Sequence, residues 1–505
     1  MIKKDRNIGQ NRTIDKDAGQ HDDCSANMPL YVDLDGTLTP TDTAQEQILD
    51  CLFNGRGLVP LIKAAIVLDI PEAKSAASIH AEFRADLLPF CGELIKYIRN
   101  ARALGRPVVL ATAADQRTAD AVAKHLGIFD RVLASKDGQN LKGKTKLLAI
   151  KKDAGNGDFE YVGDSRADLE IWNAATKVGF VATQHKIEKW TLIWGYKTTL
   201  SVTSKHSLSD LIRAMRPQQW AKNLLVFLPL LFAHAYSEIE ALEASLISFV
   251  AFSFVAAAVY ILNDLSDLAA DRQHPRKRLR PFAAGKASPI TGIVTALVLL
   301  CVAFAISLLT LSVPFAMFLL IYLCTTTAYT IVLKQYSTID VLTLAFLYTL
   351  RVGAGAVATG LSISPWLLTF CFFFFVSLAY MKRFIEVLDV AEQGEKLPSR
   401  NYWGGEDTLM FSFGIVNAGL CLLTLAQYIG SSSIEVAYSA PDLLWLTIPL
   451  IMFWLNRSWL YAARGKVGDD PVAFAVRDRI SRLVLFLVVV TIFIAKYLTL
   501  ETVLL

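Results

Sequence analysis

Residues 255–281 read VAAAVYILNDLSDLAADRQHPRKRLRP, an apolar run that turns acidic and then strongly basic. The apolar run begins further back, and Ala244–Leu262 is long enough to cross a bilayer as a helix. Similar runs follow at Ile293–Leu311 and Leu483–Leu500. Several such segments in one chain indicate an integral membrane protein over its second part.

Three carboxylates follow the apolar run at helical spacing. Asp264, Asp267 and Asp271 stand at i, i+3 and i+7, which would place them on one face of a helix. Like charges at a membrane boundary are costly unless a cation lies among them, and oxygen ligands of this kind suit Mg²⁺ carrying a diphosphate. The basic run after Asp271 offers donors for phosphate oxygens. The stretch therefore predicts a magnesium site for a phosphorylated substrate.

Composition separates the 505 residues into at least two domains. Apolar residues make up 53% and charged ones 19%, and the apolar excess begins after about residue 220. The net charge of +4 is too small to indicate a nucleic-acid partner, and the seven cysteines lack the paired spacing of a zinc site or disulfide framework. Residues 1–28 are polar without an apolar core, so we expect a flexible tail and a cytosolic N-terminal domain.

Three short apolar strands in the first 200 residues each end in polar side chains. Leu30–Val32 runs into Asp33-Leu-Asp35-Gly-Thr, Val108–Ala111 ends at Thr112, and Phe159–Val162 ends at Gly-Asp164. Helical stretches separate them, which predicts a parallel α/β sheet with ligands at the carboxyl ends of its strands.

The order DxDGT, strand-end Thr, helix-starting Lys146 and GDxxxD resembles the haloacid-dehalogenase-type phosphatases over about residues 29–185. The resemblance implies a Rossmann-like domain with a helical cap at about 44–103. It makes Asp33 the nucleophile that forms an aspartyl phosphate and Asp35 the general acid and base.

The same resemblance implies the remaining site. The phosphoryl oxygens would be held by Thr112 and Lys146, and Mg²⁺ by Asp33, Asp35 and Asp164. Asp168, one turn further on, is either another metal-site residue or a solvated helix residue.

Residues 186–215 read as a linker with an interfacial helix at Leu208–Met215, and residues 216–505 as an all-α membrane domain. Nine hydrophobic segments are expected there, at about 221–236, 243–265, 290–311, 313–333, 338–360, 364–388, 408–430, 441–463 and 480–503. Among the loops between these segments, Lys and Arg occur only in those after every second segment. This positive-inside pattern predicts a cytosolic N-terminus and an external C-terminus.

The acidic triplet and the following His-Pro-to-Arg-Pro run resemble the first signature of the UbiA superfamily, over about residues 210–505. That superfamily has nine transmembrane helices and a cytosol-facing active site. Where its quinone-precursor enzymes carry a second aspartate pair, this chain has Tyr329, Lys334 and Asp340, with Arg351 inside a hydrophobic segment. These residues look like the decaprenyl-phosphate phosphoribosyltransferase branch.

That branch implies Mg²⁺-dependent transfer of 5-phosphoribose from phosphoribosyl pyrophosphate to polyprenyl phosphate. Fewer carboxylates and more cations suit two anionic substrates better than a neutral aromatic acceptor. The catalytic carboxylates would be Asp264, Asp267 and Asp271, which would also hold the metal. The implied substrate-binding residues are Lys222, Asn263, Arg272, His274, Lys277, Arg280, Tyr329, Lys334, Asp340, Arg351, Lys382, Arg383 and Glu386.

The fusion points to two steps at a bacterial inner membrane, because phosphoribosyl transfer leaves a 5-phosphate that a phosphatase could remove. Such lipids feed sugar donors for cell-envelope polysaccharides. The alternatives are an aromatic prenyltransferase with an independent phosphatase and a non-catalytic membrane scaffold. Two residue-level alternatives also stand: Arg351 could pair with Asp340, and Arg276 and Arg278 could serve topology or lipid headgroups.

Overall fold

The structure is a computed structural model that describes residues 28–67, 70–136, 138–195, 198–203, 207–391, 401–403, 405–468 and 470–498. The expected tail, apart from Met28, and the end of the last hydrophobic segment lie outside these residues. The chain divides into two compact units, Met1–Ala214 with Asp264–Ile293 and Met215–Asn263 with Val294–Leu505.

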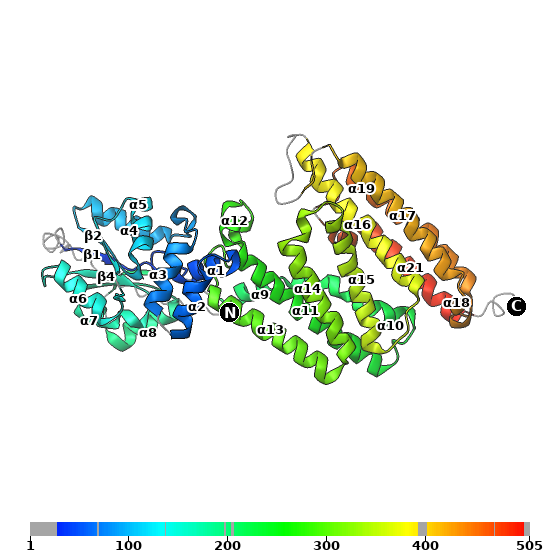
Figure 1. Ribbon diagram of the computed structural model, residues 1–505, viewed down its shortest axis with the longest axis horizontal. Helices are drawn as coiled ribbons and strands as arrows, with labels where there is room; N and C mark the ends of the chain where they lie inside the picture. The colour runs from blue at the N-terminus through cyan, green and yellow to red at the C-terminus, as the bar shows by residue number, and fades with distance from the viewer. Residues whose placement is uncertain are drawn as a thin grey trace, which may run out of the picture. The chain divides into compact units, whose positions relative to one another are not determined.

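The first unit contains a six-stranded parallel sheet with the order β3-β2-β1-β4-β5-β6. Figure 1 shows helices around its strands β1, β2 and β4. The sheet confirms the predicted α/β class. Its strands are β1 (Leu30–Val32), β2 (Val108–Asp115), β3 (Arg131–Ser135), β4 (Glu160–Gly163), β5 (Lys177–Ala182) and β6 (Thr198–Thr203).

Helices cover both faces of the sheet because neighbouring strand residues point in opposite directions. Leu30 and Val32 pack into one cluster with α4 (Gly92–Ala103) and α5 (Gln116–Leu126). Tyr31 packs into the other cluster, which includes α6 (Lys144–Asp153), α7 (Leu169–Ala174) and α8 (Gln184–Trp194). Both layers hold the carboxyl ends of β1, β2 and β4 in fixed positions.

Two boundaries differ from the expectation. The segment read as a linker contains α8, the edge strand β6 and α9 (Leu208–Ala214). The stretch read as a cap is shorter, because α4 belongs to the core of the sheet. The helices left outside that core are α1 (Thr43–Asn54), α2 (Leu58–Val67) and α3 (Ile70–His80), whereas the short turn η1 (Ala85–Leu87) contributes Ala85 to it.

Eight helices among the described residues are long and apolar enough to cross a membrane, so the protein is a multi-pass membrane protein. They are α11 (Ile239–Ser266), α13 (Pro289–Thr310), α14 (Val313–Ile331), α15 (Ile339–Thr359), α16 (Pro365–Ala391), α17 (Asp407–Ile429), α19 (Thr447–Ala463, preceded by η6, Pro441–Leu446) and α21 (Arg479–Tyr497). Shorter elements join them: α12 (Leu268–Gln273), η4 (Lys277–Leu279), η5 (Leu333–Gln335), α18 (Ser432–Ala437) and α20 (Pro471–Arg477).

The first of the nine expected segments is not a long helix. It consists of the 3₁₀ helix η3 (Pro217–Phe227) and the five-residue α10 (Leu228–Phe232). Its backbone approaches α15 so closely that a Cβ on Gly355 would lie 2.1 Å from the Val226 carbonyl oxygen. Small residues permit such contacts between membrane helices.

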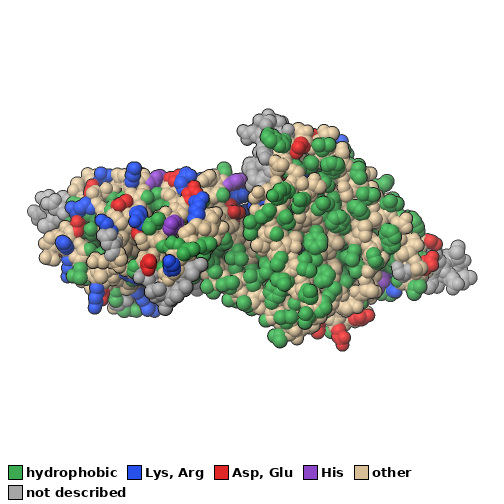
Figure 2. Space-filling model, in the orientation of Figure 1, with side chains coloured by type: hydrophobic (Ala, Val, Ile, Leu, Met, Phe, Trp, Pro, Cys, Tyr) green, Lys and Arg blue, Asp and Glu red, His purple; other side chains and the backbone are tan. Residues whose placement is uncertain are grey.

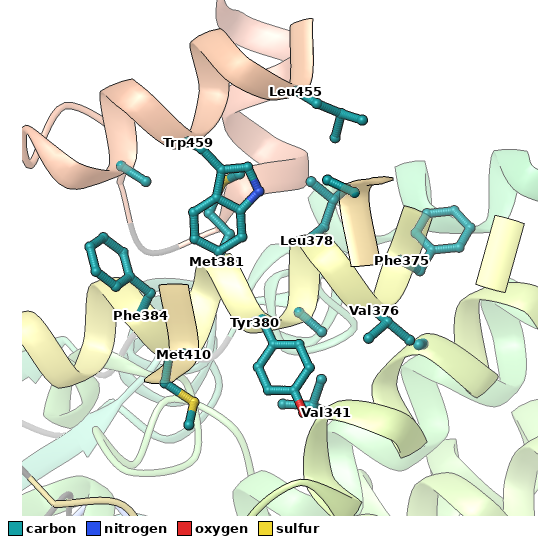
Figure 3. Packing of buried hydrophobic residues seen from close by; sticks show 14 of the residues in the cluster. Val341, Phe375, Val376, Leu378, Tyr380, Met381, Phe384, Met410, Leu455 and Trp459 are labelled. Carbon is teal, nitrogen blue, oxygen red and sulfur yellow. The ribbon is translucent and has the colours of Figure 1, made fainter. Parts of the chain in front are cut away.

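The core of the second unit lies where α15, α16, α17 and α19 meet (Figure 3). On α19, Trp459 packs over Gly414 of α17, where a Cβ would approach its ring to 2.0 Å. The Trp459 indole donates to the Ser377 hydroxyl at 3.1 Å, which satisfies the ring nitrogen. Hydrophobic side chains cover much of the visible surface of the helical part, as a membrane domain requires (Figure 2).

Candidate active sites

The carboxyl end of β1 carries the first acidic pair, Asp33 and Asp35. The Leu34 amide donates to Asp33 Oδ1 at 2.9 Å, and the Thr43 amide donates to Asp35 Oδ1 at 2.8 Å. Gly36 follows with a positive φ of 76°, and a Cβ there would lie 2.2 Å from Asp164 Oδ2. The glycine therefore lets the β1 loop close against the end of β4.

Lys146, near the start of α6, contacts Asp33 of this pair. Its Nζ lies 3.0 Å from Asp33 Oδ2, 2.9 Å from the Tyr161 hydroxyl and 3.5 Å from Asp168 Oδ1. Tyr161 in turn donates to Asp168 at 2.7 Å. Asp168 is buried, so the reading of it as a solvated residue is wrong; it positions Lys146. Tyr161 was missed, because a tyrosine within an apolar strand gives no signal of its own.

The carboxylates that could hold a cation differ from the predicted set. Ligand atoms of Asp33, Asp164 and Asp168 all lie within 4.8 Å of one another, whereas Asp35 turns to the Thr43 amide. Burial raises the pKa of Asp33 to about 6 although Lys146 opposes the rise, and burial, followed by the charges of Asp33 and Asp168, raises the pKa of Asp164 to about 8. A buried group of carboxylates that disfavour their charged forms fits a divalent cation, which would supply the missing positive charge.

Asp35 and Thr112 complete the first site. Burial, together with the charge of Asp42, raises the pKa of Asp35 to about 7, which suits a proton donor near neutral pH. Thr112 is fully buried at β2, and its Oγ1 accepts from the Ala114 amide at 3.0 Å. These residues line a cavity of about 650 Å³ that also includes Asp33, Lys146 and Asp164.

These raised pKa values predict a stability profile. The pKa of Asp33, Asp35 and Asp164 rises from 3.8 to between about 6 and 8 on folding. The protonated groups therefore make their largest contribution to the free energy of unfolding below pH 3.8. That contribution disappears as pH rises through the folded-state pKa. Without metal, we expect amide protection of β1 and β4 to fall at least about tenfold between about pH 5.5 and pH 8.5, and Mg²⁺ to restore it.

Hydrogen exchange of the full chain in detergent would measure that protection. Asp164→Asn should flatten the profile because it removes the highest of the pKa values, whereas exposed Asp158→Asn should leave it unchanged. An equally steep profile in Asp164→Asn would contradict the expectation.

The second acidic set lies where α11 ends. The predicted single helix face is interrupted, because α11 stops at Ser266 and Asp267 caps the separate helix α12. Asp264 and Asp271 nevertheless meet at one guanidinium: Arg280 Nη1 lies 3.1 Å from Asp264 Oδ1 and 2.7 Å from Asp271 Oδ2. Burial raises the pKa of Asp271 although Arg280 opposes the rise. Two buried carboxylates that share one positive group are a set that fits a cation.

Arg272, a predicted substrate-binding residue, forms an ion pair with Glu46. Its guanidinium donates two bonds to the Glu46 carboxylate, at 2.6 and 2.8 Å, and Nε donates to the Ala283 carbonyl at 3.0 Å. Both side chains of this pair are largely buried. His274 is exposed and accepts from the backbone amides of Arg276 and Lys277. Asn263 precedes Asp264 on α11, and Lys277 is exposed in η4.

In the second unit, Arg383 is fully buried and forms one network with three other predicted residues. Its Nε donates to Asp340 Oδ2 at 2.6 Å, and its other nitrogens donate to Glu386 and, at 3.1 Å, to the Tyr329 hydroxyl. The Tyr402 hydroxyl donates to Asp340 Oδ1 at 2.6 Å. Tyr402 was missed, because its position 62 residues beyond Asp340 carries no local signal.

Arg351 is buried on α15 and held by neutral groups. Nε donates to Asn223 Oδ1 at 2.8 Å, and the remaining nitrogens donate to a backbone carbonyl and, at 2.9 Å, to the Tyr322 hydroxyl. The alternative that Arg351 pairs with Asp340 is wrong, because Asp340 binds Arg383. Within the described residues, no ion pair involves Arg351.

Lys222 and Arg351 are brought together by a residue that the sequence did not reveal. The Lys222 Nζ lies 5.9 Å and the Arg351 Cζ 5.6 Å from the centre of the Tyr348 ring. Lys222 also pairs with Asp470 Oδ2 at 3.0 Å. Lys334 lies in η5, and Lys382 precedes the Arg383 network on α16.

Two family models match separate stretches of the chain. Residues 223–477 match the family model described as UbiA prenyltransferase family, and residues 30–171 match haloacid dehalogenase-like hydrolase. A relative from Sinorhizobium fredii, "Uncharacterized protein y4nM", is 34% identical over 90% of this chain and 88% of its own length. "Decaprenyl-phosphate phosphoribosyltransferase" from Mycobacterium tuberculosis is 29% identical over 55% of this chain and 90% of its own length.

A solved structure, that of a UbiA homolog from Archaeoglobus fulgidus bound to DMAPP and Mg²⁺, is also similar. It is 16% identical, with a TM-score of 0.44, over 57% of this chain and 99% of that one.

Proposed function

Because the chain belongs to the UbiA prenyltransferase family and carries a haloacid dehalogenase-like hydrolase domain before it, we propose that it is a bifunctional membrane enzyme. The first activity transfers 5-phosphoribose from phosphoribosyl pyrophosphate to a polyprenyl phosphate. The second removes the 5-phosphate and leaves polyprenyl-phosphoribose. Both sites would face the cytosol at a bacterial inner membrane, in keeping with the positive charge of alternate loops.

The observation that carries the proposal is the acidic site at the end of β1 on the same chain as the transferase motif. Lys146 contacts both Asp33 and Asp168 there, an arrangement that supports a phosphomonoesterase. Phosphoribosyl transfer yields a phosphomonoester for it. Prenyl transfer to an aromatic ring yields none. The similarity to a protein named decaprenyl-phosphate phosphoribosyltransferase supports the same donor and acceptor.

The transferase residues fit anionic substrates. Asp264, Asp267 and Asp271 would hold Mg²⁺, which would stabilise the diphosphate as it leaves C1 of ribose. In the second unit, Lys222, which also pairs with Asp470, and the buried Arg351 carry positive charge beside Tyr348, where an anionic substrate would be attracted. The Arg383 network fixes the inner end of α16 and so the position of Lys382.

The phosphatase residues fit a two-step hydrolysis. The Asp33 carboxylate attacks phosphorus while Lys146 and Thr112 hold the phosphoryl oxygens, and Asp35 gives a proton to the leaving 5-oxygen. Asp35 then takes a proton from the water that cleaves the aspartyl phosphate. Asp33, Asp164 and Asp168 would hold Mg²⁺ there, which would neutralise the charge of the phosphoryl group.

Labelled donors test the proposal directly. Purified protein with Mg²⁺ and polyprenyl phosphate is expected to move label from phosphoribosyl pyrophosphate into the lipid fraction. We expect incorporation from labelled prenyl diphosphate to be at least about a hundredfold lower, because that donor lacks the 5-phosphate that would interact with Lys222 and Arg351. Chelating the metal with EDTA is the matched control and should stop transfer. Incorporation of the prenyl label instead would favour the aromatic prenyltransferase, and no incorporation of either label would favour the scaffold.

A further inference from the structure

The phosphatase cavity is lined in part by the segment that follows the acidic transferase motif, within the same compact unit. Asp33, Asp164 and Lys146 line this cavity. Lys286, Ser288 and Thr291 line it as well and are called its wall here. A volume of about 650 Å³ greatly exceeds what one phosphoryl group fills, so the cavity suits a larger substrate with further groups to recognise.

Several contacts fix the position of this wall. Gly285 has a positive φ of 68°, and a Cβ there would lie 2.6 Å from the Pro40 ring. The Ser288 hydroxyl donates to Gln45 Oε1 at 3.3 Å. The bidentate Arg272–Glu46 pair anchors the segment before it. Lys286, between Gly285 and Ser288, is thus held on both sides while its own side chain stays exposed at the cavity.

The wall combines positive charge with an apolar part. Lys286 supplies an ammonium group that no step of the phosphatase reaction uses. Leu208 and Leu211, one turn apart on α9, line the same cavity, and Leu208 is 73% exposed. A cation and apolar side chains that line one cavity with the reacting carboxylates suit an amphiphilic substrate that carries a second anionic group.

We propose that Lys286 is a specificity-determining residue of the phosphatase. It binds a second phosphate on the substrate while Asp33 attacks the phosphomonoester, and Leu208 with Leu211 accommodates the hydrocarbon attached beyond that phosphate. The identity of this substrate as lipid-phosphoribose 5-phosphate rests on the proposed function. The requirement for a second anionic group does not.

Hydrolysis of two soluble sugars tests the requirement. Ribose 1,5-bisphosphate carries the second phosphate, and ribose 5-phosphate lacks it; loss of the 5-phosphate is followed by phosphorus NMR. The full-length wild type should prefer the bisphosphate. Lys286→Ala should lower kcat/KM for the bisphosphate roughly ten- to hundredfold, as loss of a charge-assisted hydrogen bond does, and for ribose 5-phosphate no more than about threefold. Lys286→Arg should recover most of the loss, and Lys152→Ala, an exposed lysine of α6, is the control.

A second assay uses lipid-linked ribose 5-phosphate as the substrate. It shows whether the second phosphate belongs to a lipid or to a soluble sugar. If the lipid is the substrate, Leu208→Ser should lower hydrolysis of the lipid at least about tenfold and spare the bisphosphate. Equal losses on mono- and bisphosphate in Lys286→Ala, or no loss, would overturn the inference. If the protein transfers no phosphoribose but still prefers the bisphosphate through Lys286, the inference about Lys286 stands and the proposed function is refuted.

Discussion

Asp264→Ala and Asp271→Ala are each expected to lower phosphoribosyl transfer about 10²–10³-fold, the usual effect of removing a group that stabilises developing charge. Both carboxylates are buried and share the Arg280 guanidinium. Removing either one takes a ligand from the proposed metal site and leaves the other carboxylate neutralised by Arg280 alone, so both donor binding and departure of the diphosphate should suffer. Incorporation of phosphoribosyl label into lipid measures the effect.

Two controls sharpen this test. Asp442→Ala removes an exposed carboxylate of η6 and should leave transfer near the parent rate. Phosphate release from ribose 5-phosphate should persist in the Asp264 and Asp271 variants, because Asp33, Lys146 and Asp168 are unchanged. Transfer within about threefold of the parent in either variant would remove these aspartates from the mechanism.

The second large effect is expected for Asp33→Asn. The asparagine keeps the size of the side chain and the acceptor for the Leu34 amide, but it cannot form an aspartyl phosphate. It also leaves Lys146 without its 3.0 Å partner. We expect release of inorganic phosphate to fall at least about 10³-fold and transfer to continue. Exposed Asp158→Asn, in the same domain, is the matched control. Undiminished phosphate release would show that Asp33 is not the nucleophile.

The sequence predicted the phosphatase site well because its groups stand at strand ends. The sheet order brings the ends of β1, β2 and β4 together. Asp33, Thr112 and Asp164 therefore line one cavity regardless of the conformation of the loops between the strands. The edge strand β6 was missed for the opposite reason. Its side chains are mostly exposed or half-exposed, so it lacks the apolar pattern on which strands are recognised.

The pairing of charged side chains was less predictable. The partner of Arg272 is Glu46, 226 residues earlier in the chain. Asp340 binds Arg383, although Arg351 is nearer to it in the sequence. Such choices depend on which helices pack together, which spacing along the chain does not reveal. The interruption at Asp267 was equally hidden, since Leu-Ser-Asp-Leu contains no glycine or proline to mark the end of a helix.

The mass of the lipid that the full-length protein makes from phosphoribosyl pyrophosphate and polyprenyl phosphate shows whether the two activities act in sequence. We expect wild type to yield lipid-linked ribose without its 5-phosphate, and Asp33→Asn to yield the same lipid heavier by one phosphate. If both proteins give the same phosphorylated lipid, the phosphatase serves another substrate and the two-step scheme is contradicted.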